Sequence, residues 1–183
     1  MKIYNIGSLN IDYVYNVENF VRPGETISST AYSVFPGGKG LNQSVALSRA
    51  GAKVIHGGIV GNNSEILTDT LKNAGVDISR LKIVDGPSGH AIIQVDKSGQ
   101  NCILLYGGAN QMFDEEYIDF LLSDAEKGDL ILLQNEINAL DLIFEKADKL
   151  GLEIAFNPSP LTLKVLPNRS CASTITELGR RVK

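Results

Sequence analysis

The sequence predicts an α/β protein built on a parallel sheet, and two observations lead to this prediction. In the second half of the chain, short apolar runs alternate with amphipathic stretches of helical period that end at glycine. This alternation is typical of βαβ units with right-handed crossovers. Elsewhere, two pairs of strand-like segments are joined by turn signals. We expect these pairs to form a separate small sheet that projects from one edge of the main sheet.

The composition is that of one ordinary globular domain. A chain of 183 residues can bury a sizeable core, and 43% hydrophobic with 21% charged residues excludes a disordered chain. No apolar run reaches the length of a spanning helix and the N-terminus lacks a cleavable signal layout, so we expect a cytoplasmic protein without membrane partners. The net charge of -4 argues against nucleic acid as a partner and favours a neutral small molecule.

The first half of the chain predicts both kinds of strand. Lys2 to Ile6 is an apolar strand that leads into a polar turn at residues 8–12. From Tyr13 to Phe35, loose alternation around Pro23-Gly24-Glu25 predicts two strands joined by a turn. The next predicted elements are a helix from Leu41 to Ala50, a strand from Val54 to Val60, a helix from Asn63 or Ser64 to about Asn73, and a return toward the sheet at Val76 to Val84.

The second half predicts a hairpin and then two βα repeats. Ala91 to Val95 and Cys102 to Tyr106 flank the turn signal Asp96-Lys97-Ser98-Gly99, and Cys102 is expected in the core. The following predicted elements are a helix from Asp114 to about Ala125, a strand from Leu130 to Gln134, a helix from Ala139 to Leu150 and a strand from Glu153 to Phe156. Residues 168–183 contain no buried-strand run, so we predict one unit over residues 1–167 and an irregular tail.

Polar residues gather where the carboxyl ends of the predicted parallel strands should meet. They are Asn10, Asp12, the turn from Gly37 to Asn42, Glu136 and Asn157. Carboxylates accept hydrogen bonds from neighbouring hydroxyls, amides donate and accept, and Lys39 adds three donors, which are the groups that sugar recognition uses. Glycine at 37 and 38 permits close backbone approach to a ligand. Each residue also has a structural interpretation, as a turn cap, a backbone requirement or a solvated charge.

Several other kinds of site fit the sequence poorly. A P-loop needs Ser or Thr after its Gly-Lys pair, whereas Gly40 follows Lys39. A dinucleotide fingerprint would need glycine at Gln43, which leaves a nicotinamide enzyme as a weak alternative. His56 is predicted to be a core residue and His90 a surface residue, and neither is given a catalytic role. The two cysteines lie far apart without ligand-like neighbours, so they predict neither a zinc site nor a disulfide.

The run Pro-Gly-Gly-Lys-Gly-Leu-Asn-Gln-Ser-Val-Ala-Leu at residues 36–47 resembles the first signature of the ribokinase-like (PfkB) sugar kinases. The glycines at positions 51, 58 and 61 continue the resemblance, and its nearest branch is the ribokinase group. Further matches, in family order, are Gly7 to Asp12, Pro23 to Thr26, Gly107 to Asn110, Gln134 to Glu136 and Asn157 to Pro160. Together they cover the chain from Met1 to about Pro167.

The resemblance implies a three-layer α/β core, with its parallel sheet incomplete here, and a small β-sheet lid formed by about residues 13–35 and 91–106. In this family the lid closes over a sugar and often pairs with the lid of a second subunit. By position, the residues implied to bind the sugar are Asn10, Asp12, Gly38, Lys39, Asn42 and Glu136. Ile92 and Ile103 are implied as an apolar lid wall. The family reaction transfers the γ-phosphoryl group of ATP to a terminal sugar hydroxyl, using magnesium and usually a monovalent cation.

The sequence departs from the family in its catalytic signature. The Asp-Thr-x-Gly-Ala-Gly-Asp type run, whose last Asp is the general base, is missing, and no Asn-x-x-Glu run appears after Pro160. We therefore expect a truncated sugar kinase with no catalytic residue, which on its own binds no ATP, magnesium or monovalent cation and whose ancestral reaction is phosphorylation of D-ribose. The alternatives are a non-catalytic sugar-binding or interaction module, or one half of a split kinase. A ribose-like sugar is the expected partner. Homodimerisation through the lid, or self-association through an unpaired sheet edge, is also expected.

Overall fold

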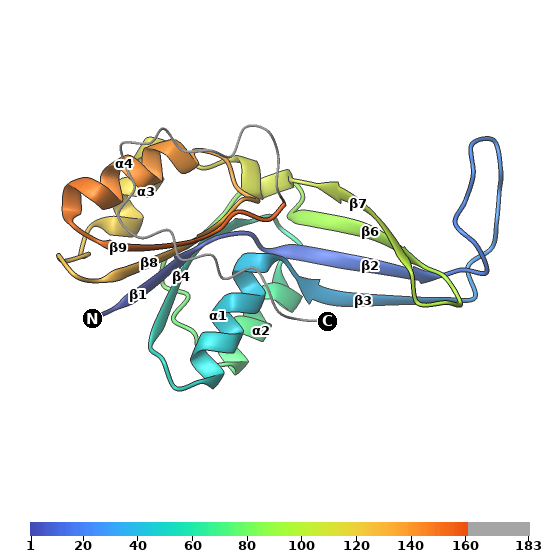
Figure 1. Ribbon diagram of the computed structural model, residues 1–183, viewed down its shortest axis with the longest axis horizontal. Coiled ribbons are helices and arrows are strands. Elements are labelled where there is room, and N and C mark those ends of the chain that lie inside the picture. The colour runs from blue at the N-terminus through green and yellow to red at the C-terminus, as the bar shows by residue number, and fades with distance from the viewer. Residues whose placement is uncertain (161–183) are drawn as a thin grey trace.

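The chain folds into two sheets, of which one carries helices on both faces and the other projects away from it (Figure 1). The computed structural model describes residues 1–160. The strands of the main sheet are β1 (Ile3–Ile6), β4 (Val54–Val60), β5 (Leu81–Ile83), β8 (Leu130–Gln134) and β9 (Glu153–Asn157). The second sheet, which we call the lid sheet, contains β2 (Asn10–Asn16), β3 (Ala31–Gly37), β6 (Gly89–Val95) and β7 (Asn101–Tyr106). The predicted α/β fold with a parallel sheet and a separate small sheet is confirmed.

The main sheet is parallel throughout and has the strand order β5-β4-β1-β8-β9. Ile3 pairs with Val54 of β4 on one side and with Leu130 of β8 on the other. The chain therefore leaves β1 toward β4 in one direction and reaches β8 in the other, which makes β1 the switch point of the sheet. Ligands of open α/β sheets bind beyond the carboxyl ends of the strands at such a point.

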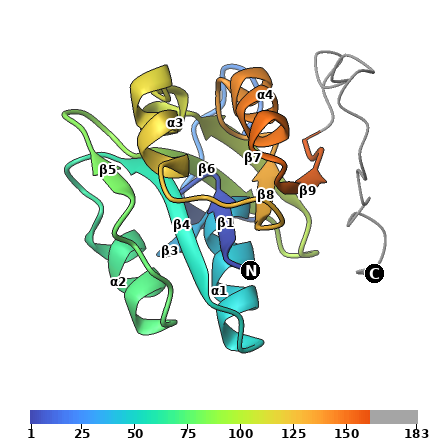
Figure 2. The same ribbon diagram turned by 90° about the vertical axis from the view of Figure 1, so that its left-hand side faces the viewer.

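Helices cover the two faces of the main sheet in separate layers (Figure 2). The helices are α1 (Lys39–Arg49), α2 (Glu65–Asn73), α3 (Glu115–Leu122) and α4 (Leu140–Leu150), with a short 3-10 helix η1 (Gly108–Gln111). Tyr4 and Ile6 of β1 pack with α3 and α4 in one apolar cluster. Leu41, Leu67 and Leu71 belong to a second cluster, on the side of α1 and α2. Two apolar clusters on opposite faces of one sheet form the expected three-layer core.

The lid sheet interleaves the two predicted strand pairs, because β2 is antiparallel to β3 and parallel to β6, and β6 is antiparallel to β7. One boundary was predicted wrongly. Asn10 and Asp12 were placed in a turn, but both lie in β2, where Asn10 is opposite Gly37 on one side and Gly89 on the other. Their alternation with Ile11 and Tyr13 has the period of a strand that is polar on one face.

Cys102 was predicted to be a core residue and is exposed instead. It lies in β7, an edge strand whose residues are all exposed, so the apolar composition of this strand did not indicate burial. The predicted tail at 168–183 lies outside the described residues. Within residues 1–160, every helix is too short or too polar to cross a lipid bilayer.

Candidate functional site

A pocket of about 330 Å³ opens at the carboxyl ends of β1 and β8, next to the lid sheet. Its lining residues are Asn10, Leu105, Gly107, Asn110, Gln111, Asn135, Glu136 and Ile137. The lining combines amides, one carboxylate and a few apolar side chains, and it lies at the switch point of the sheet. A small ligand with several hydrogen-bonding groups fits such a site.

The carboxylate of Glu136 is held at the start of α1. Its Oε1 pairs with the ammonium of Lys39, and its Oε2 accepts hydrogen bonds from the backbone N–H of Lys39 at 3.0 Å and the hydroxyl of Ser8 at 2.5 Å. The Glu136 side chain is only 7% exposed, while that of Lys39 is 33% exposed. A carboxylate at a helix N-terminus is also stabilised by the helix dipole. Glu136 is therefore a fixed charge in the pocket wall.

The glycine-rich turn before α1 crosses Ser8 at very short range. Gly38 has φ +94°, and a Cβ atom there would lie 2.8 Å from the carbonyl oxygen of Ser8. A Cβ atom on Gly40 would lie 2.5 Å from the backbone nitrogen of Ser8, and the N–H of Leu41 donates to the Ser8 carbonyl at 3.0 Å. Gly38, one of the two glycines predicted to permit ligand approach, and Gly40 thus permit the approach of one backbone segment to another.

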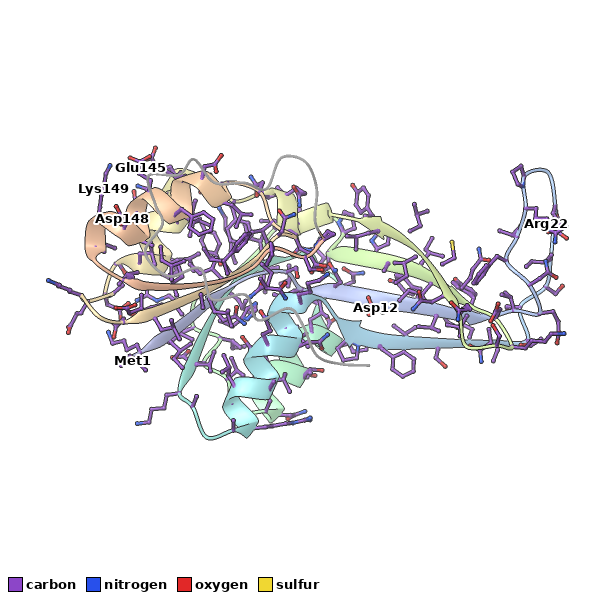
Figure 3. The ribbon with its side chains drawn as sticks, viewed as in Figure 1. Met1, Asp12, Arg22, Glu145, Asp148 and Lys149 are labelled. Carbon is purple, nitrogen blue, oxygen red and sulfur yellow. The ribbon has the colours of Figure 1, made fainter. Side chains whose placement is uncertain are left out.

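Asp12 lies beside the pocket rather than in its lining, on the part of the lid sheet nearest the main sheet (Figure 3). A Cβ atom on Gly37 would lie 2.1 Å from Asp12 Oδ2, so the carboxylate rests against the backbone of β3. Burial, and secondarily the charge of Glu136, raise the pKa of Asp12 above its ordinary value. An acidic group whose pKa is raised by burial and by a neighbouring carboxylate is a candidate functional residue when it lies next to a pocket.

The six predicted site residues are only partly brought together. Asn10 and Glu136 line the pocket, and Lys39 contacts it through Glu136. Gly38 precedes α1 without lining the pocket, and Asn42 is exposed in the first turn of α1. Asn157, at the end of β9, accepts a hydrogen bond from the backbone of Ser159 at 3.1 Å and is also outside the lining.

Several pocket residues had not been selected from the sequence. The polar ones are Asn110, Gln111 and Asn135, and Ser8, which is outside the lining, bonds to Glu136. Asn110 stands at the end of the Gly107–Asn110 run, which matches the family, and Asn135 is the neighbour of Glu136 in a second such run. Asn110 is only 1% exposed and bonds to both Leu9 and Asn10. The signal in the sequence that could have identified Asn110 was its position in a run that matches the family.

Ile92 and Ile103 were predicted to form one apolar wall of the lid, and this is wrong because they lie on opposite faces of the lid sheet. Ile103 is opposite Ile93, whereas Ile92 is opposite Leu104, and successive side chains of a strand point to opposite faces. Ile103 shares the lid face of Asp12 and of Leu105, which lines the pocket. Ile92 lines a different cavity of about 420 Å³ on the other face, beneath the loop between β2 and β3.

A second polar cluster lies buried beneath α1. His56 of β4 is fully buried, as predicted, and its Nδ1 lies 2.7 Å from the hydroxyl of Ser44 in α1. Asn5 of β1 donates to that hydroxyl and to the carbonyl of Gly40, and accepts from Gln134 of β8. Burial lowers the pKa of His56 to about 4, so the ring is neutral. Among residues 1–160, no cluster of three or more His, Cys, Asp or Glu side chains offers a metal site.

A parallel α/β sheet with helices on both faces, a polar pocket at its switch point and a projecting β sheet beside that pocket place the chain among the open α/β proteins, whose usual ligand position is such a switch point. The chain belongs to the pfkB family of carbohydrate kinases, whose family model matches residues 2–172.

Individual relatives agree with the family assignment. A ribokinase from Haemophilus influenzae is 36% identical over 162 residues, which cover 85% of this chain and 52% of that protein. The structure of a ribokinase from Cryptococcus neoformans in complex with ADP superimposes with a TM-score of 0.74 at 36% identity, over 88% of this chain and 52% of that one. An Arabidopsis thaliana ribokinase complexed with ribose and ATP gives a TM-score of 0.75 at 25% identity, over 86% and 53%. The chain thus spans about half the length of these relatives.

Proposed function

We propose that this chain forms the sugar-recognising side of an ATP-dependent sugar kinase and that D-ribose is its ligand. The observation that carries the proposal is the pocket at the switch point, where the amide of Asn10 and the fixed carboxylate of Glu136 face the same space. The relatives named ribokinase, one of them solved with ribose and ATP, support the choice of ribose. A sugar presents several neutral hydroxyl groups, which pair well with amides and carboxylates. A sugar ligand would therefore explain why the pocket is polar but not strongly charged.

Each proposed binding residue has a chemical task in this proposal. Asp12 accepts hydrogen bonds from two neighbouring hydroxyls, while Asn10 and Asn42 add amide groups. Lys39 donates from its ammonium group, and Gly38 places the first turn of α1 beside the sugar. Closure of the lid sheet would bring Asp12 and Leu105 over the ligand and exclude water from these hydrogen bonds. Desolvation strengthens every hydrogen bond in the site.

We propose that the described residues hold neither a nucleotide nor a metal ion. The sequence contains no P-loop, and the backbone N–H of Lys39 at the start of α1 already binds Glu136. The region also offers no cluster of metal-ligating side chains. We therefore assign ATP, magnesium and a monovalent cation to no residue here, and propose that these 183 residues alone do not transfer phosphate.

Calorimetry with D-ribose tests the binding part of the proposal. Wild type should bind weakly, and Asp12→Ala and Asn42→Ala should each weaken binding, since an unpaired buried hydroxyl costs about 1 to 3 kcal/mol. Asn73→Ala, at the exposed end of α2, is the matched control and should bind like wild type. Equal binding by wild type and by both site variants would refute the assignment of Asp12 and Asn42 to sugar binding.

A phosphorylation assay tests the catalytic part. The chain with ATP, magnesium and D-ribose should form no ribose 5-phosphate above a heat-killed control. Addition of the C-terminal half of an intact ribokinase-like protein separates a half-enzyme from a non-catalytic module, because only a half-enzyme can gain activity in this way. Product formed by the chain alone would contradict the proposal.

A further inference from the structure

The orientation of one amide in the pocket follows from a single backbone N–H group. The N–H of Leu9 points at the side chain of Asn110, with a distance of 3.0 Å to Oδ1. A backbone N–H can only donate, so the Asn110 atom that it meets must be the oxygen. The other end of the Asn110 amide is therefore its nitrogen. That nitrogen donates to the carbonyl of Leu9 at 3.3 Å and to Oδ1 of Asn10 at 2.7 Å.

The same logic then fixes Asn10. Because Asn110 presents a donor, the Asn10 atom that meets it must be its carbonyl oxygen. The NH₂ group of Asn10 is left as the part of this amide that is free to meet a ligand, and it donates to no protein atom within residues 1–160. Asn110 and Asn10 are 1% and 4% exposed, so neither amide can exchange this bond for one to bulk water without moving.

Gly89 gives independent support for a built contact between the two amides. It is the register partner of Asn10 in the parallel pair β2–β6. A Cβ atom at this position would lie 2.1 Å from Asn110 Nδ2 and 2.3 Å from Asn10 Oδ1. Any side chain at position 89 would therefore enter the hydrogen bond itself. Position 89 has no positive φ, so the neighbouring amides, and not backbone strain, require the glycine.

We propose that Asn110 is a positioning residue that sets Asn10 as a hydrogen-bond donor, so that the pocket requires an accepting oxygen of the sugar at this place. The inference rests on the proposed function for the identity of the ligand, but the orientation of the amide does not depend on it. A hydroxyl or ring oxygen meets the requirement. A protonated amine, which only donates, does not. Asn110 thus selects ligand chemistry without needing to touch the ligand.

Side-chain amide exchange in the ligand-free protein tests the orientation directly. In wild type, both NH₂ protons of Asn110 should exchange slowly with solvent, and those of Asn10 should exchange faster. Asn110→Asp still accepts from Leu9 but can no longer donate, so Asn10 must turn and give one of its own protons to the carboxylate introduced at position 110. Exchange of that Asn10 proton should then slow down. A slowly exchanging Asn10 NH₂ group in wild type, or no change in the variant, would overturn the proposal.

Fluorinated and deoxygenated riboses test the consequence for binding. Fluorine accepts a hydrogen bond but cannot donate one. At one ring position, wild type should bind the fluoro sugar better than the matching deoxy sugar, by about threefold. Asn110→Asp should reverse that order, because Asn10 then presents its oxygen. Asn73→Asp, which changes charge equally at an exposed site, should keep the wild-type order.

The two experiments separate the possible failures. If wild type binds none of the sugars, the proposed ligand is wrong, and the exchange measurement still decides the amide orientation. If the sugars bind and Asn110→Asp keeps the wild-type order at every position, the positioning role is refuted. Gly89→Ala provides a second route to the same contact. It should speed up exchange at Asn110 because the added methyl group separates the two amides.

Discussion

The buried histidine beneath α1 connects a single residue to the stability of the site. His56 meets Ser44, and Ser44 shares Asn5 with the carbonyl of Gly40 at the start of α1. This chain of bonds attaches the helix start, and with it Lys39, to β1 and β4. Because the ring is fully buried and its pKa is lowered to about 4, folding requires the neutral form.

Stability should therefore fall as the pH falls below neutrality. The unfolded histidine titrates near 6.5 and the folded one at about 4, so between these values the unfolded state binds the extra proton. From pH 7 to 5 the free energy of unfolding should drop by about 2 kcal/mol through this group. Urea titrations of wild type and His56→Asn should show this drop only in wild type. A His90→Asn control should still show the drop, which would assign the drop to His56.

Asp12 should make stability depend on pH in the opposite direction to His56, and over a lower range of pH. Its folded pKa is raised by burial and by Glu136, so the folded state holds the proton more tightly than the unfolded state does. The contribution of Asp12 to the free energy of unfolding is therefore largest at a pH below the ordinary pKa of an aspartate. It declines as the pH rises through the raised pKa of the folded state. Asp12→Asn should therefore unfold at higher urea concentration than wild type at pH 7, with a smaller difference at pH 4. A variant less stable than wild type at pH 7 would contradict this account.

The chemistry of single residues was easier to infer from sequence than their surroundings. The identities of Asn10 and Glu136 indicated sugar recognition, and both line the pocket. The role of Asn110 could not be inferred, because its partners Leu9 and Asn10 lie about a hundred positions away along the chain. Cys102 was misjudged because an apolar strand can be a core strand or an exposed edge, and only tertiary packing distinguishes these.

At the scale of elements, the turn into α1 should depend on glycine for two separate reasons. Gly38 and Gly24 both have positive φ, but a Cβ atom would meet Ser8 only at Gly38 and has open space at Gly24. Gly24→Ala should cost about 1 kcal/mol for the backbone conformation alone. Gly38→Ala should cost about 2 to 4 kcal/mol because the contact adds to it. Chemical denaturation of both variants measures the difference. Equal losses of stability would mean that the close contact with Ser8 adds nothing to the cost at position 38.

The lid sheet exposes apolar side chains that invite association. Ile103, Leu105 and Phe35 share one face, and their exposed fractions are 55%, 46% and 51%. We expect the chain to self-associate through this sheet at micromolar concentration. Ile103→Lys should shift the mass measured by light scattering toward the monomer. Ile83→Lys, at a similarly exposed site on β5, should not.

The same experiment separates the lid from the edge of the main sheet. β9 pairs with β8 on one side, and residues 1–160 supply no strand on its other side. An unpaired edge strand is a template for pairing with another chain. Association that persists in Ile103→Lys would point to this edge and contradict the lid account. A monomer at every concentration would contradict both.

Element order was predictable because each element carries a local signal, whereas element junctions were not. The βα alternation and the hairpin signals correctly gave two sheets. The start of β2 at Asn10 was missed because the strand begins with polar residues that face the site. The pairing of Asn10 with Gly37 and Gly89, which shows that it is part of the strand, joins residues far apart in the sequence. The split of Ile92 and Ile103 between two faces depends on the register of β6 and β7, which composition does not fix.

In the molecule as a whole, two of the cavities within residues 1–160 border the lid sheet and are candidates for the ligand site. One, of about 330 Å³, lies between the lid sheet and the carboxyl ends of β1 and β8 and is lined mainly by amides and Glu136. The other, of about 420 Å³, lies on the opposite lid face and is lined by residues that include Tyr15, Val17 and Ile92. Size alone would favour the second cavity. Hydrogen-bonding chemistry and the switch point favour the first.

Chemical-shift mapping with D-ribose on the isotope-labelled chain tests the central claim most directly. The account predicts that resonances of Asn10, Asn110, Gln111 and Glu136 move in a saturable way, while those of Tyr15, Val17 and Ile92 do not. Saturable shifts confined to the second set, or no saturable shift anywhere, would contradict the claim that this chain recognises a sugar at the switch point of its sheet.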